Sequence, residues 1–115
     1  MIDIAICDDD IGFLRYLSNV LYKLGEDQGI TVEVESFQDS RLLVERIRQG
    51  RRYDLIYLDI QMKEMGGLET AKKIREMDWT VQLVYITYYV YALVVFKVYL
   101  DTFLKERERS WAFLG

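Results

Sequence analysis

The chain has no histidine, no proline and only one cysteine, Cys7. Without histidine, three features are excluded within this chain: a histidine general base, a histidine metal ligand and a phosphohistidine relay. One cysteine cannot form an intrachain disulfide. That agrees with a reducing compartment, and we expect a cytoplasmic location.

The chain also lacks a basic excess and a long apolar run. Its net charge of -4 makes it a poor candidate for independent nucleic-acid binding, which depends on basic patches. The longest strongly apolar and uncharged run, 83–96, is shorter than the about 20 residues that a membrane-spanning helix needs. This run also contains Thr87 and several tyrosines. We interpret it as a buried strand followed by part of a helix, and we expect no membrane segment.

Half of the residues are hydrophobic, and they alternate between two patterns along the chain. The 115 residues fit one domain, 1–115, with no room for a second. Apolar or alternating segments predict strands at 2–7, 32–37, 53–60 and 81–87, with a short fifth strand near 102–104. Helical spacing between them predicts a first helix that stops at Gly25 and a second that Ser40 caps and Gly50 ends. The third helix is expected to bury a stripe formed by Leu68, Ala71, Ile74 and Met77.

Alternating strands and helices predict an α/β fold: a doubly wound, five-stranded parallel sheet with helices on both faces. The tail from residue 106 is too short for a normal last helix, so we expect that helix to be incomplete or atypical. The flavodoxin-like strand order 2-1-3-4-5 puts the second strand at an edge, which agrees with its alternating pattern. The same order creates a switch point between strands 1 and 3, and ligands bind beyond the carboxyl ends of the strands there.

Acidic residues follow the strands that meet at this switch point. Asp8, Asp9 and Asp10 come after the first strand, and Asp59 ends the third. Converging carboxylates raise one another's pKa or recruit a cation. Oxygen ligands without His or Cys favour a hard ion such as Mg²⁺. We expect Asp10 to be the N-cap of the first helix; the alternative that Asp8 and Asp9 are also only capping residues leaves Asp59 unexplained.

A carboxylate can attack phosphorus and form an aspartyl phosphate, and a metal ion would neutralise oxygens of the transferred group. Asp59 is the best nucleophile candidate, because it stands alone after a strongly apolar strand and directly before a loop. Thr87 ends the next strand and offers a hydroxyl to a phosphoryl oxygen. Lys105 ends the fifth strand and offers a positive charge.

Five segments carry a family resemblance: CDDD at 7–10, YLDIQM at 57–62, MGGLE at 65–69, YIT at 85–87 and FLK at 103–105. In this order, and over nearly the whole chain, they resemble the receiver domains of bacterial two-component response regulators. The resemblance implies that Asp59 accepts a phosphoryl group from a histidine kinase in a Mg²⁺-dependent reaction. It also implies that Asp9, Asp59 and the main-chain carbonyl of Gln61 hold the ion, with Asp8 acting through water. Thr87 and Lys105 would contact the phosphoryl group.

The resemblance extends to partners. The stretch TYYVYALVVF at 87–96 is similar to receivers that precede LytTR-type DNA-binding domains. We therefore expect a sensor histidine kinase as phosphodonor, a conformational switch that controls transcription or a partner, and DNA contact only through an output domain outside this chain. A homodimer through the face of the fourth and fifth strands stays open. Such a domain is not an enzyme beyond its own phosphorylation and dephosphorylation.

Four positions depart from the receiver pattern. Lys63 and Glu106 stand where prolines are usual, Tyr88 fills a position that is usually small, and Thr102 stands where many receivers carry an aromatic switch residue. Two alternatives therefore stay open. One is a receiver-like interaction module that is not phosphorylated.

The other alternative is a Mg²⁺-dependent phosphohydrolase of the haloacid dehalogenase type. Asp8 and Asp10 would form its D-x-D motif. Against it, Gly12 replaces the expected threonine and the chain has no room for a cap domain.

Overall fold

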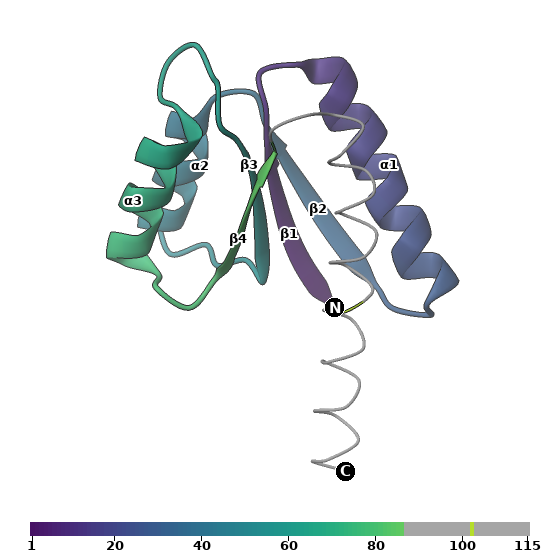
Figure 1. Ribbon diagram of the computed structural model, residues 1–115. Helices are drawn as coiled ribbons and strands as arrows, with labels where there is room; N and C mark the ends of the chain where they lie inside the picture. The colour runs from purple at the N-terminus through teal and green to yellow at the C-terminus, as the bar shows by residue number, and fades with distance from the viewer. Residues whose placement is uncertain (87–101, 103–115) are drawn as a thin grey trace.

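The computed structural model describes residues 1–86 and Thr102. Seven elements follow one another in this part of the chain: β1 (Ile2–Cys7), α1 (Ile11–Asp27), β2 (Val32–Phe37), α2 (Ser40–Arg48), β3 (Leu55–Asp59), α3 (Gly67–Met77) and β4 (Gln82–Ile86). The four strands form one parallel sheet in the order β2-β1-β3-β4 (Figure 1). This α/β, flavodoxin-like arrangement is the predicted one.

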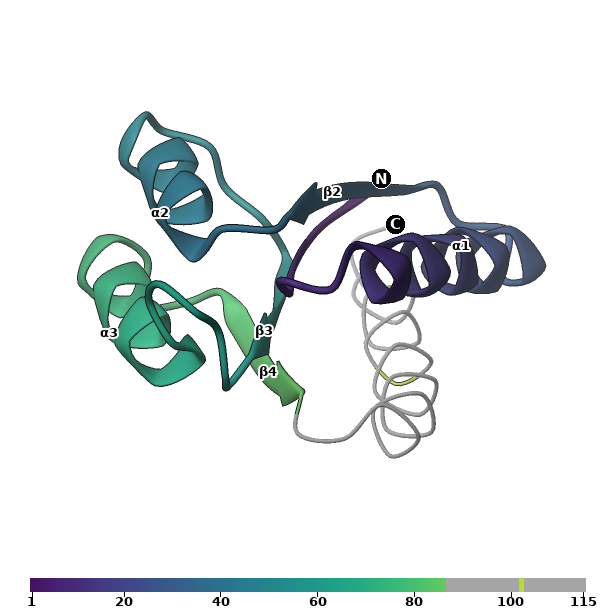
Figure 2. The same cartoon turned by 90° about the horizontal axis from the view of Figure 1, so that it is seen from above.

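The helices form two layers around the sheet. Figure 2 shows α1 on one side of the sheet and α2 with α3 on the other. Side chains alternate along each strand, so β1 contributes Ile4 and Ile6 to the core under α1 and Ala5 and Cys7 to the core under α2 and α3. β1 and β3 are buried on both faces, as expected for central strands of a parallel sheet.

The first helix runs past the predicted stop. Gly25 lies inside α1, which continues to Asp27, and the left-handed glycine of the turn is Gly29, with φ of 69°. A Cβ at Gly25 would overlap the side chain of Val32 and approach the carbonyl oxygen of Ile30 to 2.8 Å. The glycine is therefore needed for close packing of α1 against β2, and the prediction that it ends the helix is wrong.

The second and third helices also correct two details. Asp39, and not Ser40, is the N-cap of α2, and its carboxylate accepts a hydrogen bond from the Arg41 amide at 2.9 Å. Gly50 follows the end of α2 with φ of 107°, as predicted for a helix stop. Leu68 is 63% exposed, so the predicted apolar stripe of α3 begins too early, while Ala71 and Ile74 are buried as expected.

Several predictions concern residues outside the described part of the chain. They include most of the fifth strand, the last helices, the dimer face next to that strand, and the departures at Tyr88 and Glu106. Thr102 itself is helical and exposed, so a strand beginning at this residue is wrong. None of the helices in residues 1–86 is both long and apolar enough to cross a membrane.

Candidate functional site

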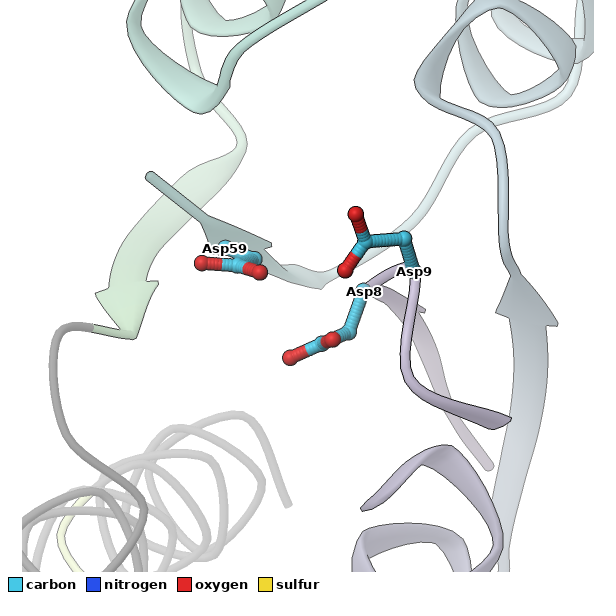
Figure 3. A group of neighbouring side chains, drawn as sticks. All are labelled: Asp8, Asp9 and Asp59. Atoms are coloured by element: carbon cyan, nitrogen blue, oxygen red, sulfur yellow. The ribbon is translucent and has the colours of Figure 1, made fainter. Parts of the chain in front are cut away.

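Three carboxylates meet at the carboxyl edge of the sheet. Asp8 and Asp9 follow β1, Asp59 ends β3, and the two strands are paired with Cys7 opposite Leu58. One carboxylate oxygen from each aspartate lies within 4.8 Å of the others. Figure 3 shows the three side chains turned toward a shared space between the two strand ends. The predicted convergence is therefore present in the structure.

Asp8 is the buried member of the cluster, with no exposed surface. Its Oδ1 accepts a hydrogen bond from the Asp10 amide at 2.8 Å, but its Oδ2 is buried without a partner among the described residues. Burial, followed by the charges of Asp59 and Asp9, raises the pKa of Asp8 from 3.8 to about 6. A buried anion with an unpaired oxygen is costly, so this position favours an incoming cation.

Asp59 and Asp9 are more open to solvent. Asp59 is half-buried, and its Oδ1 accepts a hydrogen bond from the Gln61 amide at 3.1 Å. Burial, with a contribution from the charge of Asp9, raises the pKa of Asp59. Asp9 is exposed. The main chain of Gln61 thus positions Asp59 directly, whereas the predicted role of its carbonyl group as a metal ligand stays a prediction.

Asp10 does not belong to this cluster. Its Oδ1 accepts hydrogen bonds from the amides of Gly12 at 3.0 Å and Phe13 at 3.2 Å, which makes it the N-cap of α1, as predicted. The D-x-D arrangement of a haloacid dehalogenase needs Asp8 and Asp10 at one reaction centre. Here the two side chains serve different purposes, which argues against that alternative.

The loop between β3 and α3 folds back onto the end of β3, and two glycines allow it. A Cβ at Gly67 would overlap the carbonyl oxygen of Asp59 and come within 2.9 Å of the Cα atom of Ile60. A Cβ at Gly66 would lie 3.2 Å from the carbonyl oxygen of Ile60. The glycine pair marked this segment as a loop in the sequence, but its close approach to Asp59 requires the fold.

Two buried hydroxyls hold the same loop, and the sequence pattern missed both. Ser40 Oγ donates to the carbonyl oxygen of Met65 at 2.7 Å, and Thr70 Oγ1 donates to that of Gly66 at 2.8 Å. Both residues are buried. Ser40 lies far from the loop in sequence, so only the packing of α2 beside α3 reveals that it stabilises the loop after Asp59.

The chain matches the family model of the response regulator receiver domain over residues 4–105, and it belongs to this family. It is 43% identical over 70 residues to stress response regulator protein 1 of Candida tropicalis, covering 61% of this chain and 25% of that protein. It is 31% identical over 88 residues to transcriptional regulatory protein ZraR of Escherichia coli O157:H7, covering 76% and 18%. The chain spans a quarter or less of the length of these relatives.

A solved structure has the same fold. The N-terminal domain of an uncharacterized protein from Wolinella succinogenes superposes with a TM-score of 0.68 at 19% identity, over 97% of this chain and 98% of that chain. The chain is therefore a receiver domain with a flavodoxin-like fold, a module of two-component signal transduction. Two of its predicted site residues, Thr87 and Lys105, lie outside the described residues.

Proposed function

We propose that Asp59 is the phosphoacceptor of this receiver domain. The observation that carries the proposal is the cluster of Asp8, Asp9 and Asp59, with carboxylate oxygens within 4.8 Å at the carboxyl edge of β1 and β3. Asp59 sits at the end of its strand, is partly open to solvent, and is oriented by the Gln61 amide. It is thus the carboxylate best placed to meet a phosphoryl group that arrives from outside.

The residues present fit a magnesium ion. All the donors are oxygens, and the buried Oδ2 of Asp8 has no partner within the described part of the chain. Asp9, Asp59 and the Gln61 carbonyl would hold the ion, and Asp8 would act through a water molecule. When bound, Mg²⁺ supplies positive charge that offsets carboxylate repulsion and the charge of the phosphoryl oxygens.

The reaction that we propose is a transfer between two proteins. A carboxylate oxygen of Asp59 forms a bond to phosphorus while the bond from phosphorus to the donor nitrogen breaks, and the electron pair leaves with the donor imidazole. This chain contains no histidine, so the donor histidine lies outside it, and we propose a sensor histidine kinase as the donor. Thr87 and Lys105 are proposed to contact the transferred group, and the domain catalyses no reaction other than its own phosphorylation and dephosphorylation.

The output of the switch is proposed from the relatives and from the resemblance. One relative is named as a transcriptional regulatory protein, and this chain spans 18% of its length. We propose that an output domain outside this chain, of LytTR type, contacts DNA and that phosphorylation of Asp59 controls it. A homodimer through β4 and the strand expected after it would be one way to transmit the change.

Intact-mass measurement after incubation with acetyl phosphate and Mg²⁺ tests the proposal. The expected result is one added phosphoryl group on the parent chain and none on the Asp59→Asn variant. Modification of the variant to the same extent would refute Asp59 as the acceptor. If the parent itself stays unmodified with Mg²⁺ bound, the chain is a receiver-like interaction module that is not phosphorylated.

A further inference from the structure

The outer edge of β2 presents main-chain groups in a defined register. The Ile2 amide donates to the Thr31 carbonyl at 2.9 Å, and the Asp8 amide donates to the Phe37 carbonyl at 3.0 Å. Odd-numbered residues of this segment therefore face β1, and the main-chain groups of even-numbered residues face outward. An outward row of this kind is a template for a further strand.

A tyrosine from α1 already occupies the middle of this row. The hydroxyl of Tyr22 accepts a hydrogen bond from the Val34 amide at 3.0 Å and donates to the Val34 carbonyl at 3.5 Å. The next outward residue is Ser36, which is exposed, and no described residue is hydrogen-bonded to its outward main-chain groups. An incoming strand can therefore pair with β2 at Ser36, on the carboxyl side of Tyr22.

A groove of about 660 Å³ lies beside Ser36, between α1, the end of β2 and the start of α2. Polar side chains line it, with Arg15 and Asn19 on α1 and Gln38 after β2. Its lining also includes two exposed apolar residues, Ile11 and Leu42, which are 49% and 60% exposed. The groove thus offers a main-chain edge, polar walls and an apolar contact, which together suit an extended peptide.

Charge selects the kind of peptide. Among the described residues that line the groove, Arg15 is the only charged one, although the net charge of the chain is -4. A cation beside a main-chain edge favours an acidic side chain in the incoming segment. A second copy of this chain is a poor occupant, because antiparallel pairing of two β2 strands at Ser36 would place Glu33 of each copy opposite Asp39 of the other.

We propose that the groove between α1 and the carboxyl half of β2 binds an extended, acidic segment of a partner protein, which adds to β2 at Ser36. The Arg15 guanidinium pairs with the acidic side chain, and Ile11 with Leu42 contacts an apolar neighbour. Tyr22 limits the paired stretch to a few residues. None of the three clustered aspartates is among the described residues that line this groove, so the proposal does not rest on the proposed phosphorylation.

The probe is a short fluorescein-labelled peptide of alternating valine and threonine with one central aspartate. Its controls carry lysine in place of aspartate, or N-methylated amides that remove the main-chain donors. Fluorescence anisotropy with the full chain measures affinity, and amide resonances of the ¹⁵N-labelled chain locate the peptide. We expect only the acidic, unmethylated peptide to bind and to shift the resonances of residues 36–38. Equal binding of the lysine or methylated peptide, or shifts elsewhere, would overturn the proposal.

Two variants test the groove itself. Arg15→Glu should weaken binding about tenfold or more, whereas Lys23→Glu, the same charge change on α1 outside the groove, should not. Ser36→Pro should abolish binding; the amide it removes faces outward, so no hydrogen bond to β1 is lost. Unchanged affinity in Arg15→Glu contradicts the proposal even if Ser36→Pro fails to fold. A parent dimer that Ser36→Pro dissociates would instead make this edge a self-association surface and would also overturn it.

Discussion

Asp8 is the carboxylate of the site whose ionisation is most unfavourable in the folded chain. Its pKa is raised from 3.8 to about 6, so the folded state binds a proton more tightly than the unfolded state. The corresponding stabilisation is present below about pH 4 and is lost as the pH rises through 6. Without Mg²⁺, the free energy of unfolding should therefore fall over this interval, by at most about 3 kcal/mol from this group.

Asp8→Asn tests this dependence. Asparagine keeps an acceptor for the Asp10 amide and carries no charge. The free energy of unfolding of the variant should therefore fall much less with rising pH than that of the parent, and the variant should be more stable than the parent at pH 8. Asp9→Asn is the matched control, because it leaves the burial of Asp8, the largest cause of the shift, in place. The measurement is urea unfolding in EDTA from pH 4 to pH 8. If the free energy of unfolding falls equally with pH in the parent and in Asp8→Asn, the decrease does not come from the Asp8 carboxyl.

The two adjacent aspartates should also differ in metal binding. Asp9 is proposed as a direct ligand and Asp8 as one that acts through water, so Asp9→Asn should raise the dissociation constant for Mg²⁺ more than Asp8→Asn does. Calorimetric titration of each variant measures this. Asp27→Asn, an exposed aspartate at the end of α1, controls for the loss of one charge. An equal loss in Asp8→Asn and Asp9→Asn would reject the division of roles.

At the scale of elements, the loop after β3 is held by close backbone contact. Gly67→Ala should destabilise the chain by about 2 kcal/mol or more, because the new methyl group meets the backbone of Asp59 and Ile60 and neither can move freely. Gly66→Ala should cost less than about 1 kcal/mol, since its nearest atom lies at 3.2 Å and its φ of -66° suits alanine.

Thermal and urea unfolding give both stabilities, and acetyl phosphate labelling reports whether Asp59 has moved. The labelling rate should fall in Gly67→Ala and change little in Gly66→Ala. If the two alanine variants are equally stable and are labelled at the same rate, the contact seen at Gly67 has no special importance for the site.

The sequence predicted the order of the strands but not the packing roles of individual residues in the helices. Strand order and the meeting of Asp8 with Asp59 follow from alternating elements and from the rule that ligands bind at a switch point. The roles of Gly25, Ser40 and Leu68 did not follow, because each depends on which neighbouring element packs against it. A glycine inside a helix and a glycine after one look alike in sequence until the partner strand is known.

At the scale of the whole molecule, the sequence alone predicted the fold class and the family, and the family match over residues 4–105 confirms both. It could not separate an N-cap aspartate from a D-x-D motif on spacing alone, and the side-chain hydrogen bonds of Asp10 decide that point. It correctly placed the second strand at an edge of the sheet, but it did not find that the Tyr22 hydroxyl of α1 is hydrogen-bonded to the main chain of Val34 at this edge.

Because Cys7 is buried, the rate at which its thiol is alkylated measures how often the sheet opens. The side chain has no exposed surface, and burial, followed by the charge of Asp8, raises the pKa of its thiol from 9.0 to about 12. Alkylation must wait for β1 to separate from its neighbours. We expect the reaction in native buffer to be about a thousandfold slower, or more, than in urea.

Mg²⁺ should slow the labelling further, because an ion shared by the ends of β1 and β3 holds the two strands together. Mass spectrometry of samples quenched at intervals reads the rate, and matched ionic strength in sodium chloride is the control. Labelling as fast in native buffer as in urea would mean that the thiol is open to solvent. A Cys7 alkylation rate that does not change with Mg²⁺ would mean that the ion does not couple the two strands. The alkylation rate of one residue thus reports both the local opening of the sheet and the binding of metal at its carboxyl edge.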